Sequence, residues 1–377
     1  MHASISPSPR RRRVIRTVFI SVIASVLIVI GLGFWQLNEF AITPGQSTNV
    51  EPSLTIKGLA VNAHPDKVNI VDVWLQQLTM LQFVLMHFQN NVAFVSGDQL
   101  VTPGVPTSEL NAQGFQEMND AKLAAEYAAF TALGWHISST PTGAVITDVL
   151  ANSPAEAAGL AVQDRVVAAN GRPIRTGCDL IAVLNKLPGT SELKLDVVAG
   201  SFSASGHLVT GKEHTYVLRT RSMPAGATPD GCPGITTPDK SYLGVGVEDG
   251  VAYHLPAAIT IRTDNIGGPS GGLAMTLAIM DRLSKDSLTG GHAIAVTGTI
   301  DASGNVGDIG GLAQKTIAVE RAGVKYFLVP ADQKSEATAV ASRGLHVIGV
   351  STLAQALKEL RRLGGAIPTP ITSPTNP

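Results

Sequence analysis

Charged residues are scarce in this sequence, and neither sign is in excess. Asp, Glu, Lys and Arg make up 15% of the 377 residues, and the formal net charge is −1 at pH 7. A protein that holds nucleic acid by its phosphates needs a basic excess, so the composition argues against a nucleic-acid partner. Apolar residues make up 44%, which is enough for about two or three domains with cores of their own.

Cysteine is nearly absent. Cys178 and Cys232 are the two that occur, and two cysteines alone are too few for a structural zinc site. They are either a disulfide pair, which an oxidising compartment permits, or two independent small buried residues. Cys232 lies in a Pro/Gly-rich segment that a disulfide would fix, and this favours the pair. No metal site is predicted.

A long run without charge lies near the N-terminus. Residues 17–38 are dominated by Val, Ile, Leu, Phe and Trp, and as a helix they would span about 30 Å of hydrocarbon. Trp35 lies near the end of the run, where its ring suits the membrane interface. The run therefore predicts one transmembrane anchor. A cleaved signal peptide is the alternative, with Gly31-Leu32-Gly33 as a poor cleavage site.

The basic residues predict the orientation of this anchor. Five arginines lie in residues 1–16, and the first acidic residue is Glu39. By the positive-inside rule, residues 1–16 are a cytoplasmic tail and everything after the anchor is extracytoplasmic. The sequence thus predicts a single-pass protein of the plasma membrane, with the lipid bilayer as one partner.

Residues 39–125 are predicted to be a separate N-terminal segment outside the membrane. Its apolar stretch, residues 68–88, is interrupted by polar residues such as Asp72 and Gln82. A second membrane span is therefore not expected, and we interpret the stretch as a strand followed by a helix.

Short strands and turns follow in residues 126–222. Strand patterns lie at 143–149, 164–171, 193–198 and 214–218, with a capped short helix at 153–160 and a longer helix at 179–187. The series resembles a PDZ domain of the bacterial type. The resemblance implies a β-sandwich or barrel with two helices that binds an extended peptide by strand addition. It places the carboxylate-binding loop at Leu133, Gly134 and Trp135, although Trp135 in a core is equally expected.

Two segments have the composition of irregular chain. Residues 223–239 are rich in Pro and Gly and predict a linker. Residues 364–377 are rich in Gly, Pro, Thr and Ser and predict a disordered tail. Between them, residues 240–363 predict a compact α+β block.

A serine lies on a glycine-rich turn in this block. The sequence Gly267-Gly268-Pro269-Ser270-Gly271-Gly272 falls between a predicted strand at 258–261 and a helix with apolar residues at helical spacing. Ser270 is thus expected at a helix N-terminus, where unpaired N–H groups favour an oxyanion. Its own N–H and one from Gly268 or Gly271 are the expected donors. A simple N-capping serine is the alternative.

A lysine follows in a stretch without other charges. Lys315 lies in the first turn of a helix that Gly310-Gly311-Leu312 opens, and no other charged residue occurs between Asp308 and Glu320. The helix dipole and apolar neighbours both favour the neutral amine. To act as a base near neutrality its pKa must fall by about three from about 10.4. A surface lysine on an ordinary helix is the alternative.

Taken together, these motifs resemble the proteolytic domain of the Lon family, serine peptidases with a Ser-Lys dyad. Gly-Pro-Ser, the strand Val296-Thr297-Gly298-Thr299-Ile300 and Gly-Gly-Leu-x-x-Lys occur in the family's order, and the resemblance covers residues 240–363. It implies Ser270 as the nucleophile, Lys315 as the general base and Thr297 as the hydroxyl that positions the amine. It implies no metal or organic cofactor, and a homo-oligomer such as a hexameric ring.

The chain departs from the common Lon motif, Asp-Gly-Pro-Ser-Ala-Gly, because Gly267 replaces the acid and Gly271 the alanine. Membrane-anchored, PDZ-containing Lon-like peptidases have Ile-Gly-Gly-Pro-Ser, which matches this chain. The ATPase module of Lon is not found. Residues 206–212 have the spacing of a phosphate-binding loop, but Glu213 replaces its hydroxyl residue.

The sequence therefore predicts an α+β protein with an N-terminal transmembrane helix, an inserted PDZ domain and a C-terminal Lon-type proteolytic domain. Its predicted activity is that of an ATP-independent serine endopeptidase, which hydrolyses peptide bonds of membrane or extracytoplasmic proteins and takes peptides or unfolded proteins as substrates through the PDZ domain. Two alternatives stay open. One is an α/β-hydrolase that uses Ser270, Asp332 and His346, although only about 90 residues lie between the serine and the predicted tail. The other is a membrane-tethered PDZ adaptor without catalysis.

Overall fold

The structure is a computed structural model that describes residues 9–62, 67–100, 110–202, 208–223, 232, 241–263 and 266–372. Residues 1–8 of the predicted cytoplasmic tail, the predicted linker apart from residues 223 and 232, and the last five residues of the predicted disordered tail lie outside the described residues.

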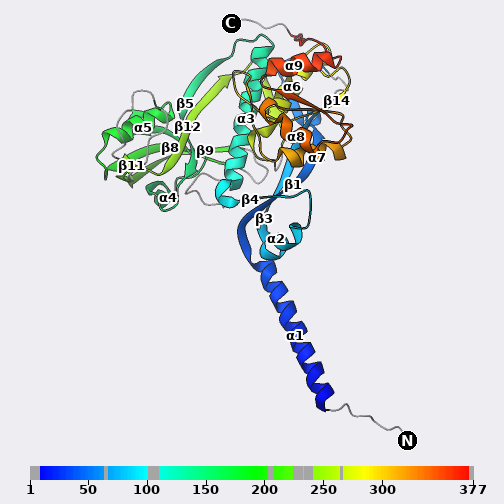
Figure 1. Cartoon of the computed structure of the whole chain (residues 1–377). Helices are drawn as coiled ribbons and strands as arrows, with labels where there is room; N and C mark the ends of the chain where they lie inside the picture. The colour runs from blue at the N-terminus through cyan, green and yellow to red at the C-terminus, as the bar shows by residue number, and fades with distance from the viewer. Residues whose placement is uncertain are drawn as a thin grey trace.

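Helix α1 (Pro9–Phe34) leaves the body of the protein as an isolated helix (Figure 1). Its stretch Arg16–Phe34 has a mean hydropathy of 2.6 and no part of it is buried, so it is long and apolar enough to cross a membrane. The helix ends at Phe34 and not at residue 38 as predicted. The reason is that the next residues pair as a strand: Gln36 lies opposite Thr79, and Trp35 accepts a hydrogen bond from the Met80 N–H.

One mixed six-stranded sheet is the scaffold of the larger body, in the order β18-β17-β14-β3-β1-β4. The first four strands run parallel to one another, β1 is antiparallel to β3, and β4 is antiparallel to β1. The strands are β1 (Gln36–Asn49), β3 (Lys67–Thr79), β4 (Ala93–Ser96), β14 (Ala293–Val296), β17 (Tyr326–Pro330) and β18 (His346–Val350). Residues 39–125, predicted to be separate, thus supply half of the strands and belong to the same body as the C-terminal block.

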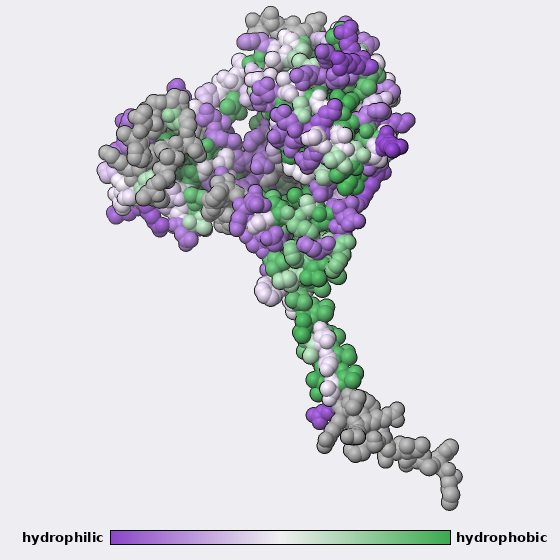
Figure 2. Space-filling view, viewed as in Figure 1, coloured by the Kyte–Doolittle hydropathy of each residue, from purple (hydrophilic) through white to green (hydrophobic). Residues whose placement is uncertain are grey.

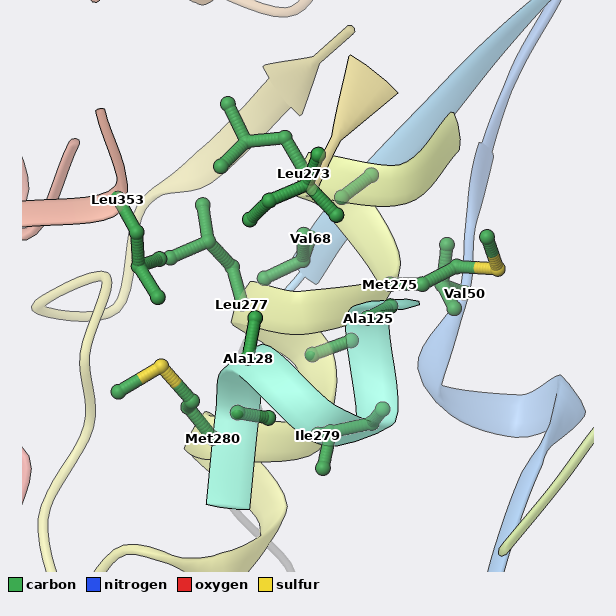
Figure 3. Close-up of a cluster of buried hydrophobic side chains, with 14 of the residues drawn as sticks. Val50, Val68, Ala125, Ala128, Leu273, Met275, Leu277, Ile279, Met280 and Leu353 are labelled. Atoms are coloured by element: carbon green, nitrogen blue, oxygen red, sulfur yellow. The ribbon is translucent and has the colours of Figure 1, made fainter. Parts of the chain in front are cut away.

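Helices cover both faces of this sheet. On one face lies α6 (Gly272–Leu283), whose residues are almost all buried, and α3 (Leu110–Ala132) packs over it. Figure 3 shows why the two helices approach closely, since α3 presents Ala125 and Ala128 to the large apolar side chains of α6. On the other face lie α7 (Leu312–Arg321) and α8 (Lys334–Val340). Helix α9 (Leu353–Arg362) adds buried residues to the core around α6, and α2 (Met80–Met86) lies next to the end of α1. Alternate strand residues serve the two cores, as the pleat of a sheet requires.

Short strand pairs complete the larger body. Strand β2 (Leu54–Lys57) pairs with β13 (Ala258–Ile261), and β15 (Thr299–Ile300) pairs with β16 (Val306–Gly307). The first pair joins the N-terminal and C-terminal parts of the chain. The second closes a turn beside the sheet.

The smaller body is a sheet in the order β12-β5-β6-β8-β9, with a core of its own. Its strands are β5 (Ser138–Val149), β6 (Arg165–Ala169), β7 (Arg172–Pro173), β8 (Glu192–Phe202), β9 (Leu208–Arg219) and β12 (Val245–His254), with helices α4 (Pro154–Ala158) and α5 (Gly177–Lys186). The turn signals in the sequence are confirmed. Ser153 accepts a hydrogen bond from the Glu156 N–H, and Asn170 and Gly171 have positive φ of 49° and 73°.

The two bodies are joined by the long ribbon of β5 and β12 and by α3, which lies between them (Figure 1). Gln116 of α3 donates a hydrogen bond of 2.6 Å to Glu248 of β12, and Gln113 donates to Asp148 of β5. Asp120 of α3 also faces the carboxylate of Glu248. Burial, the charges of Glu248 and Glu117 and a hydrogen bond with Glu248 raise the pKa of Asp120 to about 7.

The beginning of the predicted disordered tail is ordered. The Ala366 N–H donates to the Ser287 carbonyl, the Lys285 N–H donates to the Thr369 carbonyl, and Pro370 forms a β-bridge with Ser284. Residues 364–372 therefore differ from the sequence prediction, because their backbone pairs with the turn after α6.

The raised pKa of Asp120 predicts that the free energy of unfolding is larger at mildly acidic pH than at pH 8. Its pKa is raised on folding, so ionisation costs stability above about pH 7, and that cost disappears as the pH falls toward the unfolded value near 4. We expect the Tm of the full chain to rise from pH 8 to pH 5.5. In Asp120→Asn the rise should be smaller by about 2–4 °C, the shift that 1 kcal/mol gives in a domain of 150–250 residues.

Thermal melts in detergent at the two pH values measure this effect. Glu126, whose pKa burial also raises to about 7, acts in the same direction, so part of the rise should remain in the variant. Asp286→Asn, at an exposed carboxylate in a remote turn, is the matched control. An unchanged rise in Asp120→Asn would contradict the interpretation.

Candidate active site

The serine loop connects β13 to α6 through a short 3-10 helix, η4 (Pro269–Gly271). Gly268 opens this helix at φ 85°, a conformation that favours glycine. The Ser270 carbonyl accepts the Gly298 N–H at 2.9 Å and the Thr297 hydroxyl at 3.2 Å. These bonds hold the loop against the end of β14 and leave the Ser270 side chain partly exposed.

Two glycines of the loop lie close to neighbours that a side chain would crowd. A Cβ on Gly267 would lie 3.1–3.2 Å from backbone atoms of Gly114 in α3, and a Cβ on Gly271 would lie 2.3 Å from Ile70 Cδ1. These are the two positions at which the chain departs from the common Lon motif. At the first position a side chain would crowd α3, and at the second a methyl group would require the Ile70 side chain to move.

Lys315 enters the site from α7. Gly311 precedes this helix at φ 67°, and the Lys315 side chain is only 2% exposed. Its Nζ lies 2.6 Å from Ser270 Oγ and 3.3 Å from Thr297 Oγ1. The structure thus brings together the three side chains that the sequence singled out, from three separate segments of the chain.

Burial lowers the pKa of Lys315 to about 8, and the charge of Asp72 in β3 partly opposes this shift. Asp72 is also fixed by the backbone, because its Oδ1 accepts the Gln46 N–H at 2.5 Å. Sequence reasoning missed this carboxylate near the lysine. The available signal was a lone acid within the apolar stretch 68–88, but its neighbour in space depends on a pairing between distant segments.

The expected oxyanion donors are not equivalent. The Gly268 N–H donates to the Gly114 carbonyl at 2.7 Å, so it is occupied in this structure. Ser270 is the second residue of a 3-10 helix, where the helix itself supplies no acceptor for the N–H. Gly271 is the third residue, whose N–H is directed at the Gly268 carbonyl by the i→i+3 pattern.

His346, which the hydrolase alternative requires, is placed elsewhere. It begins β18 and stacks on Tyr326 with 5.5 Å between ring centroids, whereas the Ser270 hydroxyl is bonded to Lys315. His346 also lines an open cavity of about 580 Å³ that contains neither Ser270 nor Lys315. Among the described residues, no group of three or more His, Cys, Asp or Glu side chains is arranged to hold a metal.

The predicted peptide-binding loop at Leu133, Gly134 and Trp135 lies at the end of α3 and packs in the larger body, not in the smaller one. Leu133 and Trp135 are buried in the core around α6, and the Trp135 ring packs edge-on against Phe130 at 5.5 Å. The alternative in which Trp135 belongs to a core describes the structure. The sequence placed the loop before β5, while the strand at the end of the smaller sheet is β12.

Strand β12 is an edge strand of the smaller sheet, and helix α5 lies beside it. This strand ends the sheet order, and the Gly177 N–H at the start of α5 donates to Asp249 Oδ1 of β12 at 2.8 Å. Leu243 and Gly244, which precede β12, lie next to the core of the smaller body, and Gly244 has φ 81°. The sequence patterns did not single out Leu243 and Gly244, which join β11 (Ser241–Tyr242) to β12.

The two cysteines are joined. Cys178, in the first turn of α5, forms a disulfide with Cys232, with 5.5 Å between their Cα atoms. The bond ties residue 232, which the sequence placed in the linker, to the helix that lies beside β12.

Comparison with known proteins identifies both bodies. A family described as "Lon protease (S16) C-terminal proteolytic domain" matches residues 248–361, and a family described as "PDZ domain" matches residues 145–198. The chain carries a Lon-type proteolytic domain and a PDZ domain. Both resemblances inferred from the motifs are thereby confirmed. Strands β1, β3 and β4 lie outside both matched ranges, although they complete the sheet of the Lon-type domain.

Known relatives match part of the chain. The Lon protease of Azospirillum brasilense is 35% identical over 111 residues, 29% of this chain and 13% of the relative. That of Koribacter versatilis (strain Ellin345) is 37% identical over 112 residues, with the same coverage. That of Helicobacter pylori (strain ATCC 700392 / 26695) is 27% identical over 178 residues, 46% of this chain and 21% of the relative. The chain thus spans 13% to 21% of the length of these relatives.

The position of Asp72 predicts a shift in the pH profile of peptide cleavage. A lysine base is active when neutral, so the rate should rise with pH through the pKa of Lys315, near 8. Asp72 favours the charged amine. Asp72→Asn should therefore lower this pKa and move the acidic limb of the profile of kcat/KM to lower pH, while asparagine keeps the acceptor for Gln46.

The measurement is kcat/KM on a fluorogenic peptide from pH 6 to pH 10. Asp286→Asn again serves as the control and should leave the limb unmoved. A limb that stays in place or moves to higher pH in Asp72→Asn would show that this carboxylate does not act on the lysine.

Proposed function

We infer that this chain is an ATP-independent serine endopeptidase with Ser270 as its nucleophile and Lys315 as its base. One observation carries the proposal: a nearly fully buried lysine amine lies 2.6 Å from the hydroxyl of a partly exposed serine. A serine hydroxyl is a weak nucleophile unless a base lies within hydrogen-bonding reach. The match of residues 248–361 to a Lon proteolytic domain supports the same reaction class.

The acylation step follows from this contact. The neutral amine of Lys315 accepts the proton of Ser270 Oγ, and the oxygen attacks the carbonyl carbon of the scissile bond. The carbonyl oxygen becomes an oxyanion, which the Ser270 N–H stabilises, with the Gly271 N–H as a second donor once it leaves Gly268. The tetrahedral intermediate then collapses, and the ammonium of Lys315 gives its proton to the departing amine. The products are an acyl-enzyme and a free peptide amine.

Deacylation reverses these roles. Lys315 accepts a proton from a water molecule, and the hydroxide oxygen attacks the acyl carbon. Collapse of the second tetrahedral intermediate breaks the ester bond, and the proton returns from Lys315 to Ser270 Oγ. Thr297 takes no proton in this scheme. It accepts a hydrogen bond from Nζ at 3.3 Å and donates to the Ser270 carbonyl, so it fixes the amine and the serine loop relative to each other.

The PDZ domain supplies a place for the substrate chain. A peptide that adds as a strand along β12 would pair its backbone with the edge of the sheet and lay its side chains against α5. The ribbon of β5 and β12 leads from this edge to the Lon-type domain. Peptides or unfolded proteins are therefore the proposed substrates. Homo-oligomerisation, including a hexamer, stays a prediction from the resemblance.

Helix α1 is the proposed membrane anchor. It is unburied and apolar over Arg16–Phe34, and the arginines that precede this stretch favour a cytoplasmic N-terminus. Both domains would then lie on the extracytoplasmic side of the plasma membrane. A disulfide between Cys178 and Cys232 agrees with an oxidising compartment.

Substitution of either member of the dyad tests the proposal. Ser270→Ala should abolish labelling by a serine-directed fluorophosphonate and lower peptide cleavage by about 10³-fold or more. Lys315→Met, which keeps the buried aliphatic stem, should lower both to a similar degree because the two residues act as a unit. Ser303→Ala and Lys325→Met replace exposed residues of the same types and should retain wild-type rates.

The outcome also distinguishes the alternatives. A folded wild-type chain that is neither labelled nor able to cleave would support the PDZ adaptor and overturn the enzyme. Activity that survives Lys315→Met but is lost in His346→Ala would instead favour a Ser-Asp-His hydrolase.

A further inference from the structure

Large apolar side chains are exposed where the body meets α1. In the short segment of residues 80–88, which contains α2, Val84 is 48% exposed, Leu85 is 58% exposed and Phe88 is 83% exposed. No residue of α2 is buried. Adjacent exposed apolar groups of this size are uncommon on a surface that faces water alone.

This segment is attached rigidly to the end of α1. The Met80 N–H donates to the Trp35 carbonyl at 2.9 Å, and Leu81 packs against Gly33 of α1. Thr79 caps α2 in a capping box with Gln82, which fixes the direction in which the helix leaves β3. Figure 2 shows the result, a hydrophobic surface that continues from α1 into the adjoining end of the body.

The aromatic side chains at the far end of α2 fix it to the sheet as well. Phe83 lies 5.5 Å from His87 and 5.3 Å from Phe94 of β4, measured between ring centroids. Strand β4 pairs with β1 over Glu39–Ser96 to Ile42–Ala93. The segment is thus held at both ends, and its exposed side chains have a fixed position relative to α1.

The length of the apolar part of α1 places residues 80–88 at a membrane surface. Arg16–Phe34 is 19 residues long, or about 28 Å at about 1.5 Å per residue, close to the thickness of a hydrocarbon core. With α1 across a bilayer, residues 80–88 lie directly beyond the hydrocarbon, where an interfacial helix buries its apolar face. Charge agrees, because residues 73–97 contain no Asp, Glu, Lys or Arg that would have to be desolvated.

We propose that residues 80–88 form a second membrane contact, which lies in the interface of the leaflet around the end of α1. This rests on the proposed anchoring by α1. The contact would fix the tilt and height of the Lon-type domain above the bilayer, in place of a freely swinging tether.

The consequence concerns the substrate. Strands β1 and β3 run from this contact to the active site, where Ile42 and Val73 would touch a Cβ on Gly311 at 3.2 Å. From Thr79 to Asp72 the strand covers seven steps, or about 23 Å at about 3.3 Å per residue. Asp72, whose charge acts on Lys315, is therefore within about 25 Å of the proposed contact, which would keep the dyad near the membrane surface.

Tryptophan emission from the full chain tests the contact in phosphatidylcholine vesicles with or without bromine on the acyl chains. Phe88→Trp adds a reporter at the proposed contact, and Val217→Trp adds one at an equally apolar, 63% exposed site on β9 of the PDZ domain. The emission of the wild-type chain minus that of Trp35→Phe gives the emission of Trp35, the tryptophan at the end of α1. We expect bromine to quench the added emission of Phe88→Trp as completely as that of Trp35, and to leave Val217→Trp unchanged.

The other results have separate meanings. Quenching of Trp35 without quenching in Phe88→Trp overturns the second contact and leaves the anchor in place. A blue-shifted but unquenched Phe88→Trp overturns it in favour of a protein partner, such as a second copy of the chain. No quenching at either site would show that α1 does not enter the bilayer, and the contact would fail with the anchor. Val84→Trp repeats the test independently, and wild-type peptide cleavage by each variant verifies that the fold is intact.

Discussion

The burial of the Lys315 amine is the constraint on which the proposed chemistry depends. An amine that loses water without gaining an adjacent carboxylate favours its neutral form, and this makes it a base near neutral pH. Three segments are needed to exclude that water. Helix α7 carries the lysine, the end of β14 carries Thr297, and the serine loop lies across both. Asp72 opposes the shift and keeps the pKa near 8.

The same close packing explains how the loop keeps its shape without the acid and the alanine of the common Lon motif. Gly267 lies against the backbone of Gly114, and Gly271 leaves room for Ile70 of β3. Both neighbours come from residues 39–125, which also supply β1, β3 and β4. A family match that begins at residue 248 therefore covers the catalytic residues but not all of the elements that hold them.

Local sequence patterns predicted most elements well, because their signals are short-range, and they singled out Ser270 and Lys315, whose side chains the structure brings together. The Asn170-Gly171 turn, the Ser153 cap and the strand and helix of residues 68–88 depend on neighbours a few residues away. The errors concern contacts between distant segments. Residues 39–125 were separated from the sheet that they complete, and Leu133 and Trp135 were assigned to the PDZ groove although α6 buries them. Periodicity cannot show which sheet a strand joins, or which of two cores a helix end enters.

Helix α3 connects the peptide-binding and catalytic parts of the molecule. Its Gly114 carbonyl holds the Gly268 N–H of the serine loop, and its Asp120 and Gln116 face Glu248 on β12. Residues 114 and 120 are separated by only about 9 Å along the helix axis. Because a helix of this length moves as a rigid unit, a displacement of the β12 ribbon must either carry the serine loop with it or break one of these contacts. The hydrogen bond that occupies Gly268 is thus mechanically linked to the strand on which we propose that the substrate peptide binds.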